Sequence, residues 1–401
     1  MNFLIPIVAL LLAGWLAISK RLSGSTSWQA TVTPLASIMG SGFLISAPLL
    51  GGLVGTWAVV GMLCLLVIAY LVGEAIRYNI RHFEPVEQDH GPPQTVAFLS
   101  RLVLVGAYFI SVVYYLELLA VFALHLVGVE NQFEANLITS ALLLVIGLIG
   151  FVKGLGSLEK VERFAVALNL GMVGALLAGL LFYNAARALN GSWQMPDVNS
   201  EINRADLRVL LGLLIVVQGF ETSRYLGAKH SAEERIRTMR FAQLLSGAIY
   251  ILFVALATVL FRRGMGGDVT AILLLTKEVA LVLPVLLTVA ALGSQFSAAV
   301  ADTAGAGGLV VEISGDRFTQ RTAYVLIMGV TLTLTWLVDV NEVIAMASRA
   351  FALFYALQCL VAMLMAFRNK KLPSSSARGF GFGCLSLVCL SVVIFGIPAE
   401  S

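Results

Sequence analysis

The stretch Ala36-Ser37-Ile38-Met39-Gly40-Ser41-Gly42-Phe43 places a Gly-Ser-Gly element in the middle of an apolar segment long enough to cross a bilayer. Glycine weakens a helix, and a broken helix leaves backbone N–H and C=O groups without helical partners. Hydrocarbon tolerates such groups only where the backbone faces protein, water or a bound solute. The sequence therefore predicts a discontinuous membrane helix over about 29–49 that lines a solute site.

Composition sets the class of protein. The chain has 401 residues, of which 59% are hydrophobic and only 12% are charged, and its mean hydropathy is +0.92. A soluble core cannot hide that much apolar surface, so we expect an integral membrane protein, in a bacterial inner (plasma) membrane. Membrane lipid and a small-molecule substrate are the expected partners and nucleic acid is not, while the sequence indicates no oligomeric state.

A window of about 19 residues gives the expected membrane spans. We predict 11–12 transmembrane helices, and the twelve candidate spans cover about 3–19, 29–49, 53–76, 98–127, 136–153, 162–186, 208–226, 241–262, 282–310, 322–338, 341–367 and 380–397. Most of the 26 Lys and Arg residues fall in alternate loops, which the positive-inside rule assigns to the cytoplasm. The span over 29–49 therefore begins on the cytoplasmic side.

The spans suggest an internal repeat. Without the first and last spans, ten helices remain, five beginning at the Gly-Ser-Gly helix and five at the helix that carries Gln218-Gly219-Phe220-Glu221. An odd number of helices in each half makes the halves inverted relative to each other. We predict an extra N-terminal transmembrane helix and linker over 1–27, five-helix repeats over 28–190 and 191–370, and a C-terminal transmembrane helix over 371–401.

Two motifs carry a resemblance to a known family. Ser37-Ile38-Met39-Gly40-Ser41-Gly42-Phe43-Leu44, followed by Ala47-Pro48, resembles the first core helix of amino acid–polyamine–organocation (APC) superfamily transporters. Val217-Gln218-Gly219-Phe220-Glu221 is similar to their sixth-helix G-F-E element. The resemblance implies an all-α membrane protein with a LeuT-type 5+5 inverted repeat and discontinuous first and sixth core helices. It is to a divergent member, because Glu312-Ile313-Ser314-Gly315-Asp316-Arg317 stands where relatives often carry A-R-D-G.

The resemblance also implies a function and a site. It implies a secondary active transporter, working by alternating access, that carries a small amino acid or related amine in symport with Na⁺ or H⁺. In the family the first element receives the substrate carboxylate and the second holds the amino group. The implied substrate-binding residues are Ser37, Gly40, Ser41, Gly42, Phe43, Tyr114, Gln218, Gly219 and Phe220. The alternatives are a carrier of a nucleobase or of an inorganic or organic anion on the same fold, and a solute-sensing membrane protein.

Two sets of side chains are candidates for ion coupling. The resemblance implies that Ser294 and Ser297 complete a sodium site, although hydroxyls in helices also bond back to their own backbone. Asp302 and Glu221 are ionisable groups inside membrane spans, where a carboxyl is suited to carry a proton. Asn169 stands where some proton-coupled relatives have a lysine. Both coupling ions therefore remain open.

Two pairs of charged residues and the absence of known catalytic motifs allow further predictions. Glu117 and Arg349 lie at matching depths below the outer ends of their helices, so we expect them to pair as a gate. A permanent structural pair, or contact of Arg349 with an anionic substrate group, is the alternative. Glu221 and Arg224 are spaced to pair on one helix face. The chain has no catalytic or metal-binding motif, so we predict no enzyme activity, no metal site and no cofactor beyond the coupling ion.

Overall fold

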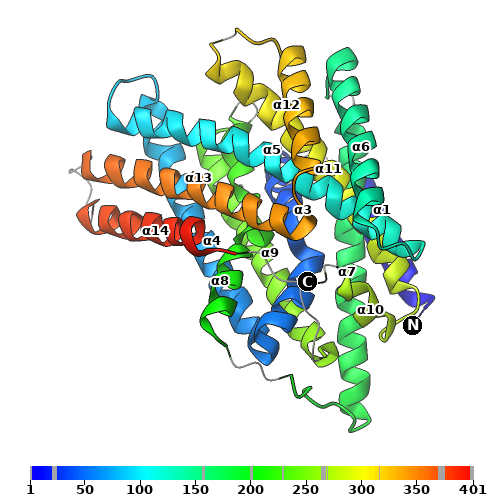
Figure 1. Cartoon of the computed structure of the whole chain (residues 1–401). Coiled ribbons are helices and arrows are strands. Elements are labelled where there is room, and N and C mark those ends of the chain that lie inside the picture. The colour runs from blue at the N-terminus through cyan, green and yellow to red at the C-terminus, as the bar shows by residue number, and fades with distance from the viewer. Residues whose placement is uncertain are drawn as a thin grey trace.

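The computed structural model describes residues 2–19, 25–155, 159–198, 202–227, 230–262, 268, 270–315, 317–368 and 375–397, with backbone alone at 41 and 159–164. In these ranges the regular structure is helical throughout (Figure 1). The elements in chain order are α1 (Leu4–Ile18), α3 (Thr26–Val54), η1 (Gly55–Trp57), α4 (Ala58–His82), η2 (Glu84–Val86), α5 (Pro92–Leu126), α6 (Gln132–Lys153), α7 (Glu159–Leu189), α8 (Arg204–Gly212), η4 (Leu214–Val217), η5 (Phe220–Leu226), α9 (Ala232–Ala257), η6 (Thr258–Leu260), α10 (Ala271–Lys277), α11 (Leu283–Ile313), α12 (Gln320–Thr335), α13 (Val340–Arg368) and α14 (Ser375–Phe395).

Each predicted span corresponds to a helix or to an interrupted helix. Within the described residues, eight helical stretches are long and apolar enough to cross a membrane, and one of them, Thr26–His82, contains both α3 and α4. The other predicted spans are α1 with 15 residues, α12 with 16, and the segment divided into α8, η4 and η5. The protein is therefore a polytopic integral membrane protein.

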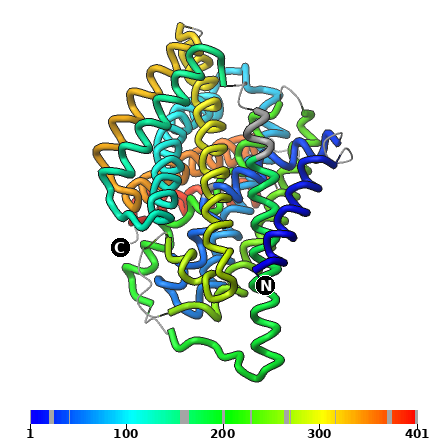
Figure 2. Tube along the Cα trace, turned by 90° about the vertical axis from the view of Figure 1, so that its right-hand side faces the viewer, coloured from blue at the N-terminus to red at the C-terminus, as the bar shows by residue number. Residues whose placement is uncertain are grey.

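The helices form two groups that cross. α5, α13 and α14 lie side by side and run across the group that contains α3, α7 and α9 (Figure 1). α11 packs against both α5 and α7, and α6 pairs with α12 at one side of the molecule (Figure 2). The interrupted helices α3 and α8–η4–η5 are packed between α9 and α13, so both breaks lie in the buried centre.

The terminal helices add to this core. α1 lies along α7 (Figure 2), where Gly171 and Gly174 leave room for Ala13 and Leu12. α14 packs along α13. The division of the ten central helices into repeats over 28–190 and 191–370, with flanking segments 1–27 and 371–401, stays a prediction.

Local chemistry sets several helix starts. The Ser25 side chain accepts a hydrogen bond from the Trp28 N–H at the start of α3, and Ser231 does the same for Glu234 in α9. At α8, Asn203 and Asp206 form a reciprocal capping box. This cap fixes the start of the helix whose continuation is interrupted at the site.

Candidate functional site

The two predicted breaks are present. In α3 the backbone leaves the helical region at Gly42, with φ 178° and ψ 13°. In the second segment η4 ends at Val217 and is followed by Gln218, whose ψ of 174° is extended, and η5 starts after Gly219, whose φ of +114° favours glycine. The sequence therefore correctly placed both discontinuities, to within one or two residues.

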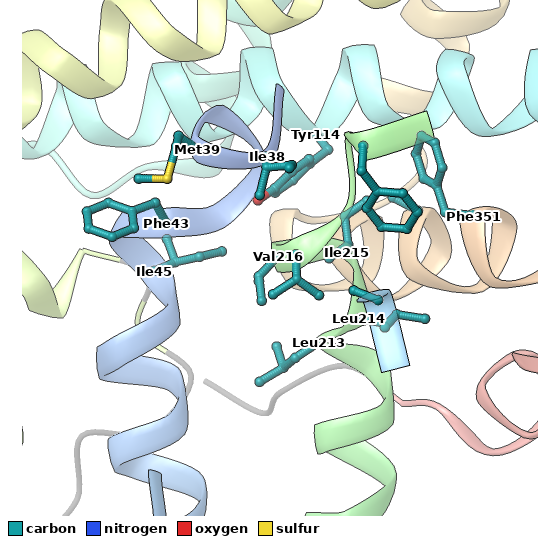
Figure 3. Close-up of a cluster of buried hydrophobic side chains, with 14 of the residues drawn as sticks. Ile38, Met39, Phe43, Ile45, Tyr114, Leu213, Leu214, Ile215, Val216 and Phe351 are labelled. Atoms are coloured by element: carbon teal, nitrogen blue, oxygen red, sulfur yellow. The ribbon is translucent and has the colours of Figure 1, made fainter. Parts of the chain in front are cut away.

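The two breaks pack directly on each other. A Cβ atom on Gly42 would lie 2.7 Å from the Cα atom of Val216, and one on Gly219 would lie 2.5 Å from Oγ of Ser37. Figure 3 shows the side chains of Ile38 and Val216 between the two ribbons. Both glycines are therefore required by the close approach of the segments, and Ser37 is brought to the site as predicted. The side chain of Ser41 lies outside the described residues.

A tyrosine that sequence reasoning missed joins the two segments. The hydroxyl of Tyr250 on α9 lies 2.9 Å from the carbonyl oxygen of Ile38 and 2.5 Å from that of Val216. The ring of Phe43 packs edge-on against that of Tyr250, with the ring centroids 5.3 Å apart. Its centroid lies 4.4 Å from that of the Phe253 ring. Phe43 is thus turned toward α9, so it does not share a ring stack with Phe220.

On α5, Tyr115 makes a hydrogen bond to the second interrupted helix. Nε2 of Gln218 donates a 2.7 Å hydrogen bond to the hydroxyl of Tyr115. Tyr114 belongs to the buried apolar cluster of Figure 3, and its ring lies 5.0 Å from that of Tyr115. The neighbouring tyrosine therefore makes the contact with the second interrupted helix.

Glu221 holds the start of η5. Its Oε2 accepts a 2.9 Å hydrogen bond from the N–H of Gly219 and a 2.8 Å hydrogen bond from the hydroxyl of Tyr355 on α13. The carboxylate is 1% exposed, and its Oε1 has no hydrogen-bond partner within the described ranges. Phe220 stacks on Tyr355 at 5.2 Å with an interplanar angle of 17°. A buried acid with an open oxygen therefore lies beside the break.

A second acid lies on α11. Asp302 is 5% exposed, and its Oδ2 accepts a hydrogen bond from the hydroxyl of Ser111 on α5. Asp302 and Glu221 are close enough for their charges to interact. Two carboxyl groups in a low-dielectric site cannot both be ionised cheaply. The pair is therefore suited to hold a proton or a cation.

The serines predicted for sodium lie near the first break. Ser294 Oγ donates to the carbonyl of Ala291 in its own helix at 3.2 Å, which is the alternative role considered for it, and Ser297 is buried one turn further along α11. Nε2 of Gln295 donates a 3.1 Å hydrogen bond to the carbonyl of Gly40. α11 therefore contacts the broken backbone through Gln295.

Asn169 is buried on α7. It lies one turn beyond Ala165, whose side chain packs 3.7 Å from the position of a Cβ atom on Gly293. This places Asn169 on the side of α7 that faces α11.

The expected pair of Glu117 and Arg349 is not formed. Nε and Nη2 of Arg349 both donate to the carbonyl oxygen of Gly396 after α14. Glu117 is fully buried, and neither carboxylate oxygen has a hydrogen-bond partner among the residues that the structure describes. Matching depth was a poor guide because it does not fix how each helix is rotated about its axis.

Arg224 also pairs elsewhere. Its Nη1 donates a 2.5 Å hydrogen bond to Oε1 of Gln358, and its Nη2 lies 3.6 Å from Oε1 of Glu87. Gln358 accepts a second hydrogen bond at Oε1 from Asn79, at 3.0 Å, and donates from Nε2 to Ser100 at 2.7 Å. This Gln358 hub, formed by Asn79, Ser100, Arg224 and Gln358, ties α4 and η5 to α5 and α13.

Within the described ranges, no group of three His, Cys, Asp or Glu residues could hold a metal ion. The ligands that the site offers are mainly oxygen atoms from backbone, hydroxyl and carboxyl groups.

Comparison with known proteins identifies the family. A family model described as APC superfamily transporter matches residues 20–396. The chain belongs to the APC superfamily of transporters. It is therefore a secondary transporter and not an enzyme. The matched range starts after α1.

Two further proteins are similar to this chain. An uncharacterized protein of Aquifex aeolicus (strain VF5) is 41% identical over 392 residues, which cover 96% of this chain and 94% of the relative. A mutant of the manganese transporter of Eremococcus coleocola has a similar structure, with a TM-score of 0.58 at 12% identity over 94% of this chain and 88% of that one. This APC transporter thus has the LeuT-type fold that its sequence predicted.

Proposed function

We propose that this protein carries a small amino acid or related amine across the membrane in symport with a proton. The observation that carries the proposal is the contact between the two interrupted helices, where backbone carbonyls meet a buried acid. Carbonyl groups of the two interrupted segments are the kind of acceptor that an ammonium group needs, and Glu221 at the second break has one carboxylate oxygen with no partner among the described residues. By family resemblance, the backbone at Gly42 would take the substrate carboxylate.

The buried acids favour a proton as the coupling ion. Glu221 lies in the second interrupted helix and Asp302 on α11, so a proton on either relieves the repulsion between two carboxylates. Ser294 is already engaged with its own helix. Sodium bound by Ser294 and Ser297 is the alternative that the experiment must separate.

Charge also argues against an anionic substrate. The described site holds the two acids Glu221 and Asp302, whereas Arg349 is bound to Gly396. A divalent cation is a second candidate cargo, since the fold is similar to that of a manganese transporter and the site is rich in oxygen ligands. A divalent cation is therefore included in the binding experiment described below.

Alternating access would move one set of helices against the rest of the protein. We infer that α3, α4, α8–η4–η5 and α9 rock as a bundle against the remaining helices. The Gln358 hub and the bond from Tyr355 to Glu221 both cross that boundary. These contacts would have to break when the site opens to the cytoplasm.

Thermal stabilisation of the detergent-purified protein tests the proposal. The panel contains amino acids, amines, nucleobases, anions and Mn²⁺, each in sodium and in choline buffer at two pH values. A ligand at 100 times its dissociation constant stabilises the folded protein by about 2.7 kcal/mol. An amino acid or amine hit that does not need sodium supports the proposal. A hit confined to Mn²⁺, a nucleobase or an anion rejects the substrate, and a hit that requires sodium rejects the proton.

A further inference from the structure

The last turn of α4 and the first turn of α14 meet in a group of aromatic and basic side chains that the transport site does not use. The ring centroids of Tyr78 and His82 on α4 lie 4.4 Å apart, and that of Phe382 on α14 lies 5.2 Å from that of Tyr78. Arg378, one turn before Phe382, is exposed and is close enough to Tyr78 and His82 for an electrostatic interaction. Arg81 is a second exposed arginine, next to His82. We call Tyr78, Arg81, His82 and Arg378 the α4–α14 basic cluster.

The cluster has no acidic partner among the described residues. Its three basic side chains make neither an ion pair nor a side-chain hydrogen bond within those ranges. Asp89, an acid that follows α4, is instead 3.6 Å from Arg368 at the end of α13. The sequence between α13 and α14, residues 369–374, contains two lysines and no acid. The cluster therefore consists of hydrogen-bond donors without an anionic acceptor.

The helix dipoles explain only part of this cluster. Arg81 and His82 lie in the last turn of α4, where cations interact favourably with the negative end of the dipole. Arg378 is the fourth residue of α14, where the positive end of the dipole disfavours a cation. A structural role in neutralising helix ends therefore fits Arg81 and His82 but not Arg378, whereas a bound anion fits all three.

The surroundings of the cluster indicate which kind of anion fits. The positive-inside rule places this end of both helices at the cytoplasmic surface of the membrane. On α14, Phe380, Leu387 and Ile394 recur every seven residues and are 72%, 66% and 65% exposed, so they form one apolar stripe that faces lipid. Anionic phospholipids carry the negative charge of the cytoplasmic leaflet. Such a lipid can place its phosphate at the cluster and its acyl chains on the stripe, whereas a soluble anion uses the charge alone.

We propose that the α4–α14 basic cluster binds the phosphate of an anionic phospholipid, whose headgroup bridges α4 and α14 and whose acyl chains lie on the apolar stripe of α14. Guanidinium groups bind phosphate oxygens through strong charge-assisted hydrogen bonds. The hydroxyl of Tyr78 and the ring of His82 supply further donors. This site is separate from the interrupted helices and does not depend on the substrate or on the coupling ion.

Native mass spectrometry of the purified full chain tests the site, with phosphatidylglycerol as the anionic probe and phosphatidylcholine as the neutral one. Arg81→Gln and Arg378→Gln should each weaken phosphatidylglycerol binding by about fivefold or more, because each removes one charge at the membrane surface. The matched control is Arg321→Gln, at an exposed arginine on the cytoplasmic end of α12, and it should bind like the wild type. Equal binding of the two lipids by the wild type, or equal losses in all three variants, would overturn the site.

Melting of the wild type in detergent gives a second test that needs no variant. Phosphatidylglycerol should raise the melting temperature because it binds the folded protein, and inorganic phosphate at the same concentration should not. Raising the salt concentration from about 0.05 M to about 0.5 M should remove most of the rise, since salt screens exposed charges. A rise of equal size with inorganic phosphate would mean that the site takes a soluble anion and would overturn the lipid. A rise that salt leaves unchanged would show that the headgroup charge is not recognised.

Discussion

The hydroxyl of Tyr355 donates a 2.8 Å hydrogen bond to Glu221, so a buried acid in the second interrupted helix is fastened to α13. Glu221 also accepts the N–H of Gly219, and its other oxygen has no partner among the described residues. The carboxylate thus binds the backbone at the break and the hydroxyl on α13, while one of its oxygens has no partner among the described residues. This arrangement suits a group whose protonation changes during transport.

Replacement of Glu221 by glutamine separates its structural and coupling roles. The amide oxygen of Glu221→Gln still accepts the N–H of Gly219 but takes up no proton. We expect exchange of substrate across proteoliposomes to persist while accumulation driven by a pH gradient is lost. Glu134→Gln, at an exposed acid on α6, is the control and should keep accumulation. Undiminished accumulation in Glu221→Gln would transfer the coupling role to Asp302 or to sodium.

Gly42 is predicted to be far less tolerant of substitution than Gly308, a helical glycine with open space around it. A methyl group there meets the backbone of Val216 at 2.7 Å, so Gly42→Ala must push the two segments apart. Overpacking of this kind costs about 1–3 kcal/mol. The control is Gly308→Ala on α11, where no atom lies within 4 Å of the added carbon. Equal melting temperatures for the two variants would show that the segments are not in contact in the membrane protein.

The Gln358 hub should contribute measurably to stability. Gln358→Leu leaves the buried groups of Asn79, Ser100 and Arg224 without their shared partner. A buried polar group that loses its partner costs about 1–3 kcal/mol, so the free energy of unfolding should fall by at least that amount. Gln320→Leu changes an exposed glutamine at the start of α12 and is the control. If the hub opens during the transport cycle, its loss in Gln358→Leu should also make the site more accessible from the cytoplasm.

Arg349 is predicted to act on α14 rather than on Glu117. Arg349→Met keeps an apolar stem but removes both hydrogen bonds to the carbonyl of Gly396. We expect a modest loss of stability and an unchanged substrate dissociation constant. The double variant with Glu117→Gln should show additive effects within about 0.5 kcal/mol. A coupling energy well above that value would mean that the two residues pair in another conformation and would restore the gate.

The sequence was informative where a constraint is local. The glycines at 40, 42 and 219 predicted both backbone breaks because only certain residues suit an interrupted membrane helix. Apolar length likewise predicted the spans, including the short α1 and α12. These features need no knowledge of which helices touch.

The sequence was a weaker guide where the rotation of a helix about its axis decides which side chains meet. Tyr114 and Tyr115 differ by about 100° around α5, and only the structure shows that Tyr115 faces Gln218. The same reason explains the failure of the expected pair between Glu117 and Arg349. Tyr250 and Gln358 carry no motif at all, since their role comes from partners more than 30 residues away along the chain.

The central claim is that the contact between the two interrupted helices is the substrate site of a proton-coupled carrier. Uptake of the radiolabelled ligand identified by the thermal panel, into proteoliposomes under an inward proton gradient, tests it most directly. The wild type should accumulate the ligand only while the gradient lasts, and folded Gly42→Leu, whose side chain fills the contact, should not. Accumulation by Gly42→Leu equal to that of the wild type would contradict the claim.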